Sequence, residues 1–375
     1  MGQITRLASV WAAAFAVRLL YVVQSQQSPF YDFPLVDAKT YVQAATAMAL
    51  GDWVGNSQPF WQPPLYPHFL GVLFALFEPD FTLPRLVQAA LGATICLLVY
   101  WLGRRVFSSE VAWCAAGLAI FYGPFVFFEG EFLPPVLAIL LNLSALLALL
   151  WAVEGQNSRL LLPGLLFGLS TLCVANILLF TPVAAGWLFY LCRDLPARQR
   201  LLRPAVLLLG VVLAVAPVSL RNYMVGDDLV LISSNAGLNF YIGNNPESDG
   251  TYTALRFGRG DASYERGDAQ HLAEQELGRS LSPTEVSHYW FTKAISYIRE
   301  RPRHWRRLMV RKLALTVNVA EVPDTEDHQV YAQWSVLLRA LGPVFNFGVL
   351  FPVASFGLYQ KYISTSSYLS YLNEK

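Results

Sequence analysis

Two aspartates, Asp32 and Asp37, come just after the first apolar segment of the chain and lie near the start of the stretch FYDFPLVDAKTYVQAATAMALGDW at residues 30–53. Small and apolar residues recur after Asp37 with helical spacing, which predicts an amphipathic helix that starts near this residue. An aspartate at such a position can cap free amides and complement the helix dipole, and we expect this kind of turn role for Asp32. For Asp37 we expect chemistry, because a carboxylate in a groove at a bilayer surface keeps its charge while the low dielectric magnifies its effect on a hydroxyl.

Hydrogen-bonding and aromatic side chains surround this acid in the sequence. Tyr41 lies one helical turn after Asp37, and the segment FWQPPLYPH at residues 60–68 supplies Gln62, Tyr66 and His68. A sugar site requires this mixture of polar groups and aromatic surface. We therefore expect Tyr41, Gln62 and Tyr66 to bind substrate beside Asp37.

Two further acids, Glu129 and Glu131, stand between apolar segments in FFEGEFLPP at residues 127–135. An acid at the end of a span is costly unless it is solvated or used. The two glutamates therefore either line a substrate cavity, which is the role for which we select them, or belong to a hydrated loop.

Arg221 marks the end of a later apolar segment and precedes a chain of Asn, Ser and Gly residues. Its side chain can extend to a lipid phosphate at the membrane surface. Alternatively, its planar guanidinium can hold the phosphate of a lipid-linked substrate through two parallel donors. The Gly-Asn-Asn run at residues 243–245 permits tight turns and presents amides, and we include Asn244 among the expected binding residues.

The composition places these residues in a membrane protein. The chain has 375 residues, of which 55% are hydrophobic and 14% are charged, and its formal net charge is +1. A soluble domain is about a quarter charged, so this chain has too few charges to cover a water-facing surface. The near-zero net charge argues against a nucleic-acid partner. The five scattered histidines require no metal site, so a divalent metal is possible but unsupported, and no other cofactor is required.

The elements that must position the acids follow from hydropathy and charge. Apolar runs long enough to cross about 30 Å of hydrocarbon occupy residues 4–23, 83–103, 111–128, 132–153, 204–220 and 343–358. Basic clusters at residues 103–105 and 193–203 indicate cytoplasmic loops.

The number of membrane crossings between two loops is odd when they lie on opposite sides and even when they lie on the same side. This rule assigns the apolar segments that hydropathy leaves ambiguous. Residues 63–77 are expected to form an interfacial or re-entrant helix on the outer side, and residues 160–191 a hairpin of two short helices that turns near Ala175 and Asn176. The six Arg and Lys residues at 301–320 favour an interfacial helix, although a crossing there would reverse the last span. We therefore predict an all-α polytopic membrane protein with about eight transmembrane helices and interfacial helices on its outer face.

Three parts of the chain are expected. Residues 1–220 would form a transmembrane catalytic module whose first outer loop is residues 24–78. Residues 221–327 would form an outer segment with interfacial helices, and residues 328–375 the last span and tail.

Several of these stretches together resemble a known superfamily. VDAKTYVQAATAMALGDW, then FWQPPLYPHFLGVLFALFEPDFTLPRLVQAALGA and GRRVFSSEVA resemble the opening of membrane glycosyltransferases with the C-type fold, and VSLRNYMVGDDLVLISSNAGLNFYIGNNP is similar to a later landmark of bacterial members. The branch is that of the protein O-mannosyltransferases and the lipid A aminoarabinose transferase. Members move a sugar from a polyprenyl phosphate to an acceptor hydroxyl with inversion, on the outer or lumenal face.

The resemblance also assigns roles to residues. Asp37 in LVDAKTY matches the essential aspartate of the first outer loop and would be the general base. The aminoarabinose transferase type has an Asp-Glu pair and a Lys before Pro-Pro-Leu, where this chain has Asp37-Ala38 and Gln62-Pro63-Pro64-Leu65, so Arg221 remains our candidate phosphate ligand. The resemblance implies a bacterial inner membrane protein whose site faces the periplasm, with membrane lipid and a hydroxyl acceptor of unknown identity as further partners.

Other functions fit parts of the pattern. A polymerase or ligase of surface polysaccharide is a near neighbour of this hypothesis. A transporter or flippase would need charged or broken helices in mid-membrane and often two related halves, whereas Arg18 is almost alone in a span and no repeat is visible. A non-catalytic membrane scaffold would leave Asp37 dispensable.

Overall fold

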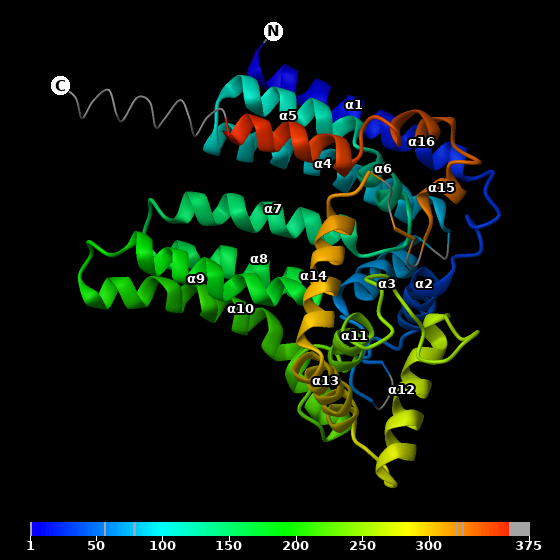
Figure 1. Ribbon diagram of the computed structural model, residues 1–375. Helices are drawn as coiled ribbons and strands as arrows, with labels where there is room; N and C mark the ends of the chain where they lie inside the picture. The colour runs from blue at the N-terminus through cyan, green and yellow to red at the C-terminus, as the bar shows by residue number, and fades with distance from the viewer. Residues whose placement is uncertain (1, 56–57, 78–79, 320–321, 324–325, 360–375) are drawn as a thin grey trace.

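The computed structural model describes residues 2–55, 58–77, 80–319, 322–323 and 326–359, and within these ranges it contains helices and no strand. One set of helices forms a bundle whose axes run roughly side by side, and the other helices gather at one end of it (Figure 1). This architecture confirms the predicted all-α polytopic membrane fold.

The bundle is built from the apolar runs of the sequence. Among the described residues four helices are long and apolar enough to cross a membrane, and one bent pair forms a fifth candidate. They are α1 (Gln3–Ser25), α4 (Thr82–Val106), α7 (Pro135–Ala152), α10 (Ala197–Gly226), and the pair α5 (Ser109–Phe121) and α6 (Gly123–Gly130). The pair bends by 52° where Pro124 enters the first turn of α6.

The remaining three of the eight expected spans are represented by shorter helices. After the 3₁₀ turn η1 (Asn157–Leu160), the predicted hairpin consists of α8 (Leu161–Thr171), η2 (Ala175–Leu179) and α9 (Phe180–Leu191), so the chain turns where the sequence indicates. Helix α8 packs closely on α10, because a Cβ at Gly164 would overlap the carbonyl of Leu207. The last segment is the apolar helix Phe347–Tyr359.

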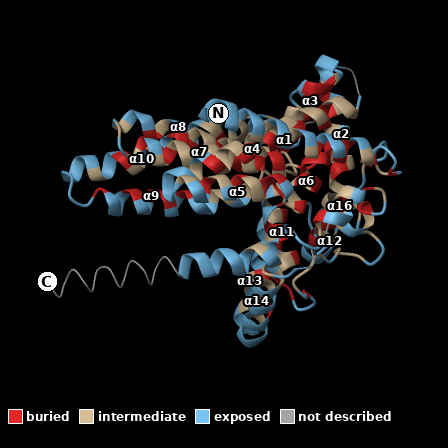
Figure 2. Ribbon diagram, turned by 90° about the horizontal axis from the view of Figure 1, so that it is seen from above, coloured by how far each residue is buried: buried red, intermediate tan, exposed pale blue. Residues whose placement is uncertain are grey.

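The side chains on the periphery of the bundle are exposed and apolar, as lipid-facing side chains are. In each of the four long candidate spans, less than two fifths of the apolar window is buried within the protein. Exposed residues border the buried core of the bundle (Figure 2). Large exposed side chains such as Leu209, Val212 and Leu213 of α10 belong to this surface.

One end of the bundle carries the elements that surround the candidate site (Figure 1). They are α2 (Val36–Ala49), α3 (Leu65–Phe77), α11 (Ala236–Gly243), α12 (Ala262–Leu277), α13 (Pro283–Glu300), α14 (Pro302–Thr316), α15 (His328–Tyr331) and α16 (Val336–Leu341). Helix α2 begins beside Asp37, and α3 has only 13 residues, as expected for an interfacial or re-entrant element. Helix α14 runs across the end of the bundle rather than along it, and its interfacial position stays a prediction.

Candidate functional site

Asp37 lies in the first turn of α2 and is held by a side chain from the loop before α3. The N-cap residue of α2 is Leu35, whose side chain cannot accept a hydrogen bond, so Asp37 is not the cap of its helix. Gln62 instead donates from Nε2 to Asp37 Oδ1 at 2.9 Å, and Thr40 donates to Gln62 Oε1 at 3.1 Å. The carboxylate is half-buried. Gln62 therefore fixes the orientation of the Asp37 carboxylate, which is still accessible from the surface of the protein.

The backbone just before Asp37 is strained. Val36 has a φ of 43°, a left-handed conformation that costs energy for a β-branched residue. Such conformations tend to persist where the surrounding structure imposes them, often at active sites. The strain at Val36 is thus an independent reason to examine the residue that follows it.

Two tyrosines form the aromatic wall expected beside Asp37. The rings of Tyr41 and Tyr66 meet edge to face with their centroids 5.3 Å apart, and both side chains are buried. Burial, and next the charge of Asp37, raise the pKa of Tyr41, so this hydroxyl stays protonated and can donate a hydrogen bond. Tyr66 donates from its hydroxyl to Gln88 Oε1 of α4 at 2.6 Å.

Gln88 and Arg85 of α4 hold the segment that contains the two glutamates. Gln88 Nε2 donates to the carbonyls of Glu129 and Glu131 at 2.9 and 2.8 Å, and Arg85 Nε donates to the carbonyl of Gly130 at 2.9 Å. Both side chains are almost fully buried. Because Tyr66 also binds Gln88, one connected network links α3 to the turn between α6 and α7.

Neither glutamate belongs to a hydrated loop, because each is buried against a partner from α1. Glu129 pairs with Arg18 at 2.5 Å, and Tyr21 donates to Glu131 Oε1 at 2.8 Å. Helix α4 leaves room for the ion pair at Gly92, where a Cβ would collide with the Glu129 carboxylate. The two acids predicted from the sequence are therefore parts of a buried network, whose partners the sequence did not indicate.

A third buried acid, Glu326, lies near this network just before α15. Tyr331 donates to its Oε2 at 2.5 Å, while its Oε1 is buried with no hydrogen-bond partner among the described residues. The pKa of Glu326 is raised to about 7, mainly by burial. The charges of Glu131 and Asp37 also raise this pKa, whereas Tyr331 and Arg85 lower it. Glu326 thus lies within electrostatic reach of the predicted site, although it is far from it in sequence.

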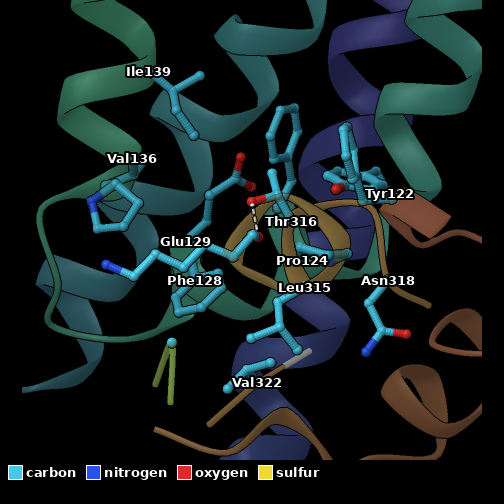
Figure 3. A pocket seen from close by; sticks show the side chains of 15 residues that line it. Tyr122, Pro124, Phe128, Glu129, Val136, Ile139, Leu315, Thr316, Asn318 and Val322 are labelled. Carbon is cyan, nitrogen blue, oxygen red and sulfur yellow. Dashed lines mark hydrogen bonds between the residues drawn. The ribbon is translucent and has the colours of Figure 1, made fainter. Parts of the chain in front are cut away.

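A cavity of about 760 Å³ opens beside Glu129 between the bundle and α14 (Figure 3). Val136 and Ile139 of α7 line one side of it, and Leu315 and Thr316 of α14 line another. Most of the lining residues are apolar. Lys312 of α14 also lines the cavity, and it donates a hydrogen bond to the carbonyl of Gly243 at 2.5 Å. The cavity therefore joins an apolar interior to one acidic and one basic group.

The other two predicted binding residues make their described contacts elsewhere. Arg221 donates to the carbonyls of Val54 and Gln58 at 2.9 and 2.8 Å, and its guanidinium lies over the ring of Phe60. These contacts fasten the loop between α2 and α3 to the end of α10.

Asn244 connects the helices α11 and α14. Its Oδ1 accepts a hydrogen bond from Trp305 Nε1 of α14 at 2.9 Å, and its Nδ2 donates to the carbonyl of Phe240 in α11 at 2.9 Å. The structure therefore brings together Asp37, Gln62, Tyr41, Tyr66, Glu129 and Glu131, and connects Asn244 to a different set of partners.

Sequence reasoning missed the residues that hold the site together. Arg18 was visible as a charge within an apolar run, which is a signal for a buried partner. Arg85 and Gln88 are three residues apart in an apolar helix and therefore share a face. Glu326 gave no such signal. In the part of the chain that the structure describes, no group of three or more His, Cys, Asp or Glu side chains could hold a metal ion.

Comparison with known proteins gives one match. Residues 61–221, from the loop that carries Gln62 to Arg221, match the family model of dolichyl-phosphate-mannose-protein mannosyltransferases. Neither a curated protein nor a solved structure matches the chain. The matched region covers α3 through most of α10 and includes Glu129 and Glu131, whereas Asp37 and Glu326 lie outside it.

Proposed function

We propose that this chain transfers a sugar with inversion from a polyprenyl phosphate to an acceptor hydroxyl at the outer face of the membrane. The match of residues 61–221 to the family model of dolichyl-phosphate-mannose-protein mannosyltransferases supports the transfer of a sugar from a lipid-linked donor. The acceptor is a lipid, a glycan or a protein, and the sugar a hexose or a pentose. Asp37 is the proposed general base.

The observation that carries this proposal is the setting of Asp37. Its carboxylate is half-buried, is oriented by the Gln62 amide and follows the strained Val36. Glu129 and Glu131, by comparison, are almost fully buried against Arg18 and Tyr21. Of these three acids, Asp37 is the one that an incoming hydroxyl can reach without dismantling the core.

In the proposed reaction the acceptor oxygen attacks the anomeric carbon from the face opposite the lipid phosphate. The bond between the anomeric carbon and the phosphate oxygen breaks, and its electron pair leaves with the phosphate. Asp37 takes the proton of the acceptor hydroxyl as the new glycosidic bond forms. Because the attack comes from the face opposite the leaving phosphate, the anomeric configuration is inverted. Cationic side chains near the leaving phosphate would stabilise its charge.

The cavity beside Glu129 supports the assignment of a lipid-linked donor. Its apolar walls suit an isoprenoid chain, and the Lys312 ammonium can face a phosphate group. Burial lowers the pKa of Lys312, because a partly desolvated ammonium lacks some of its hydration, and an anionic ligand would favour the charged form. Arg221 remains a second proposed phosphate ligand, from the sequence analysis.

The experiment that tests the proposed function is a transfer assay with the full chain in bilayer nanodiscs. A panel of polyprenyl-phosphate sugars, labelled in the sugar, is supplied together with a membrane extract as the source of acceptor. We expect Asp37→Asn to lower the transfer rate by about 10²-fold or more, as expected for loss of a general base, while Asp32→Asn retains the parent rate. Transfer by Asp37→Asn at the parent rate would eliminate the general-base role.

A further inference from the structure

Glu326 has an environment that the proposed mechanism does not yet use. Its side chain is 9% exposed, and it precedes α15, which packs on α6 through the rings of Tyr331 and Phe127 at 5.2 Å. One oxygen, Oε2, accepts the Tyr331 hydroxyl. The other, Oε1, is buried with no partner among the described residues.

A buried acceptor without a donor is costly. Leaving such a group unsatisfied costs about 1–3 kcal/mol, and more for a charged group. Native proteins contain few such atoms, and each requires an explanation, such as a functional role or a missing ligand. The ring contact with Phe127 keeps the neighbouring Tyr331 in place, so Glu326 Oε1 is held where a bound molecule can supply the donor.

The charges near Glu326 indicate which kind of molecule this is. The charges of Glu131 and Asp37 both raise the pKa of Glu326, whereas the charge of Arg85 lowers it. Two further carboxylates would repel an anion such as a phosphate, whereas a neutral molecule with several hydroxyl groups donates hydrogen bonds to carboxylates without an electrostatic penalty. A sugar ring has this chemistry.

We propose that Glu326 is a sugar-binding residue, whose Oε1 accepts a hydrogen bond from a hydroxyl group of the donor sugar. This assignment rests on the proposed function. It places a hydroxyl group of the sugar at Glu326, which lies within electrostatic reach of Asp37. Because the contact is to the sugar and not to the lipid phosphate, it provides selectivity for the transferred group.

The test separates binding of the sugar from binding of the lipid. The full chain in nanodiscs is titrated with polyprenyl-phosphate mannose, with a small panel of other polyprenyl-phosphate hexoses and pentoses, and with polyprenyl phosphate alone. We expect the parent protein to bind at least one sugar-linked lipid more tightly than the bare lipid. At pH 8, where Glu326 is ionised, Glu326→Gln replaces a charged acceptor by a neutral one and should lose about tenfold of that preference, while it should bind the bare lipid as the parent does.

Control variants keep the result interpretable. Glu300→Gln changes an exposed carboxylate of α13 and should retain the parent preference. Should Glu326→Gln fail to fold, Glu326→Asp keeps the charge but draws the carboxylate back by one methylene, and we expect it to lose the sugar preference as well. A preference equal to that of the parent in a folded Glu326 variant would overturn this inference. A parent protein that prefers no sugar-linked lipid would instead overturn the proposed donor.

Discussion

Arg18 of α1 and Glu129 of α6 form an ion pair in which each side chain is at most 2% exposed. Arg18 also donates to the carbonyls of Ala14 and Ile120, at 3.2 Å each. The pair therefore joins α1 to the bent span, just before the turn that carries Glu131. Its position makes it a structural support of the site as well as a border of the cavity.

Removing one member of this pair should destabilise the protein strongly. Arg18→Met leaves the Glu129 carboxylate buried without its cation, and loss of one partner of a buried pair costs about 3–5 kcal/mol. The double variant Arg18→Met/Glu129→Met should recover part of this loss, because no buried charge then remains. The unfolding temperatures of the purified proteins in nanodiscs rank the variants by stability. As a control, Arg279→Met breaks an exposed pair with Glu285 and should have little effect. A double variant less stable than both singles would contradict the assignment.

Gln62 should affect the reaction more than the stability. Gln62→Ala removes the donor to Asp37 Oδ1 and the acceptor for Thr40, so the carboxylate loses its fixed direction. We expect the transfer rate to fall about tenfold with little change in unfolding temperature, because misplacing a catalytic group lowers the rate. Gln43→Ala on the exposed side of α2 is the matched control. Equal rates for the two variants would mean that Gln62 does not position Asp37.

The sequence predicted the helices well because their signals are local. The apolar runs predicted the spans. The turn at Ala175 and Asn176 was predicted because the segment that contains it starts and ends on the same side of the membrane. The environment of Asp37 was also predictable, since Tyr41 and Gln62 are within 25 positions of it. The partners of Glu129 were not, because Arg18 is 111 residues away and its pairing depends on how α1 packs against α6. Burial of a charge is a tertiary property that hydropathy alone does not report.

Arg221 can now be tested for two roles with one variant. Arg221→Ala removes the donors to Val54 and Gln58 and the contact with Phe60, so we expect faster hydrogen exchange in the loop between α2 and α3. The hypothesis that Arg221 binds the donor phosphate also predicts a higher KM for the lipid donor. A higher KM together with a well-protected loop would support the phosphate role alone. Faster exchange with an unchanged KM would leave Arg221 only its role in fastening the loop.

The orientation of the bundle is open to chemical labelling. Basic residues concentrate in the loop between α9 and α10, whereas Phe33 lies before α2 at the opposite end and is 73% exposed. In a variant with the four native cysteines replaced by alanine, Phe33→Cys should react with a membrane-impermeant thiol reagent applied to intact cells. Arg198→Cys should react only after the cells are opened. The reverse pattern would place the site of Asp37 on the cytoplasmic side.

Glu326 should make stability depend on pH around neutrality. Its pKa is raised to about 7 by burial and by the neighbouring acids, against a usual value of 4.5. Between these two pH values the folded protein binds a proton that the unfolded chain does not, so the stabilisation from this group is full below about pH 4.5 and disappears as the pH rises through 7. Glu326→Gln carries no titratable group at this position.

The unfolding temperature of the parent protein should therefore fall relative to that of Glu326→Gln as the pH is raised from 5 to 8. Glu131, Asp37, Arg85 and Tyr331 face Glu326 in both proteins, so the difference between them reports mainly on Glu326 itself. Glu285→Gln serves as a control, because Arg279 and the Ser282 amide lower the pKa of Glu285 to about 2 and its contribution is constant over this range. A difference between the parent and Glu326→Gln that does not change with pH would show that Glu326 is ionised throughout, as an acid in contact with water would be.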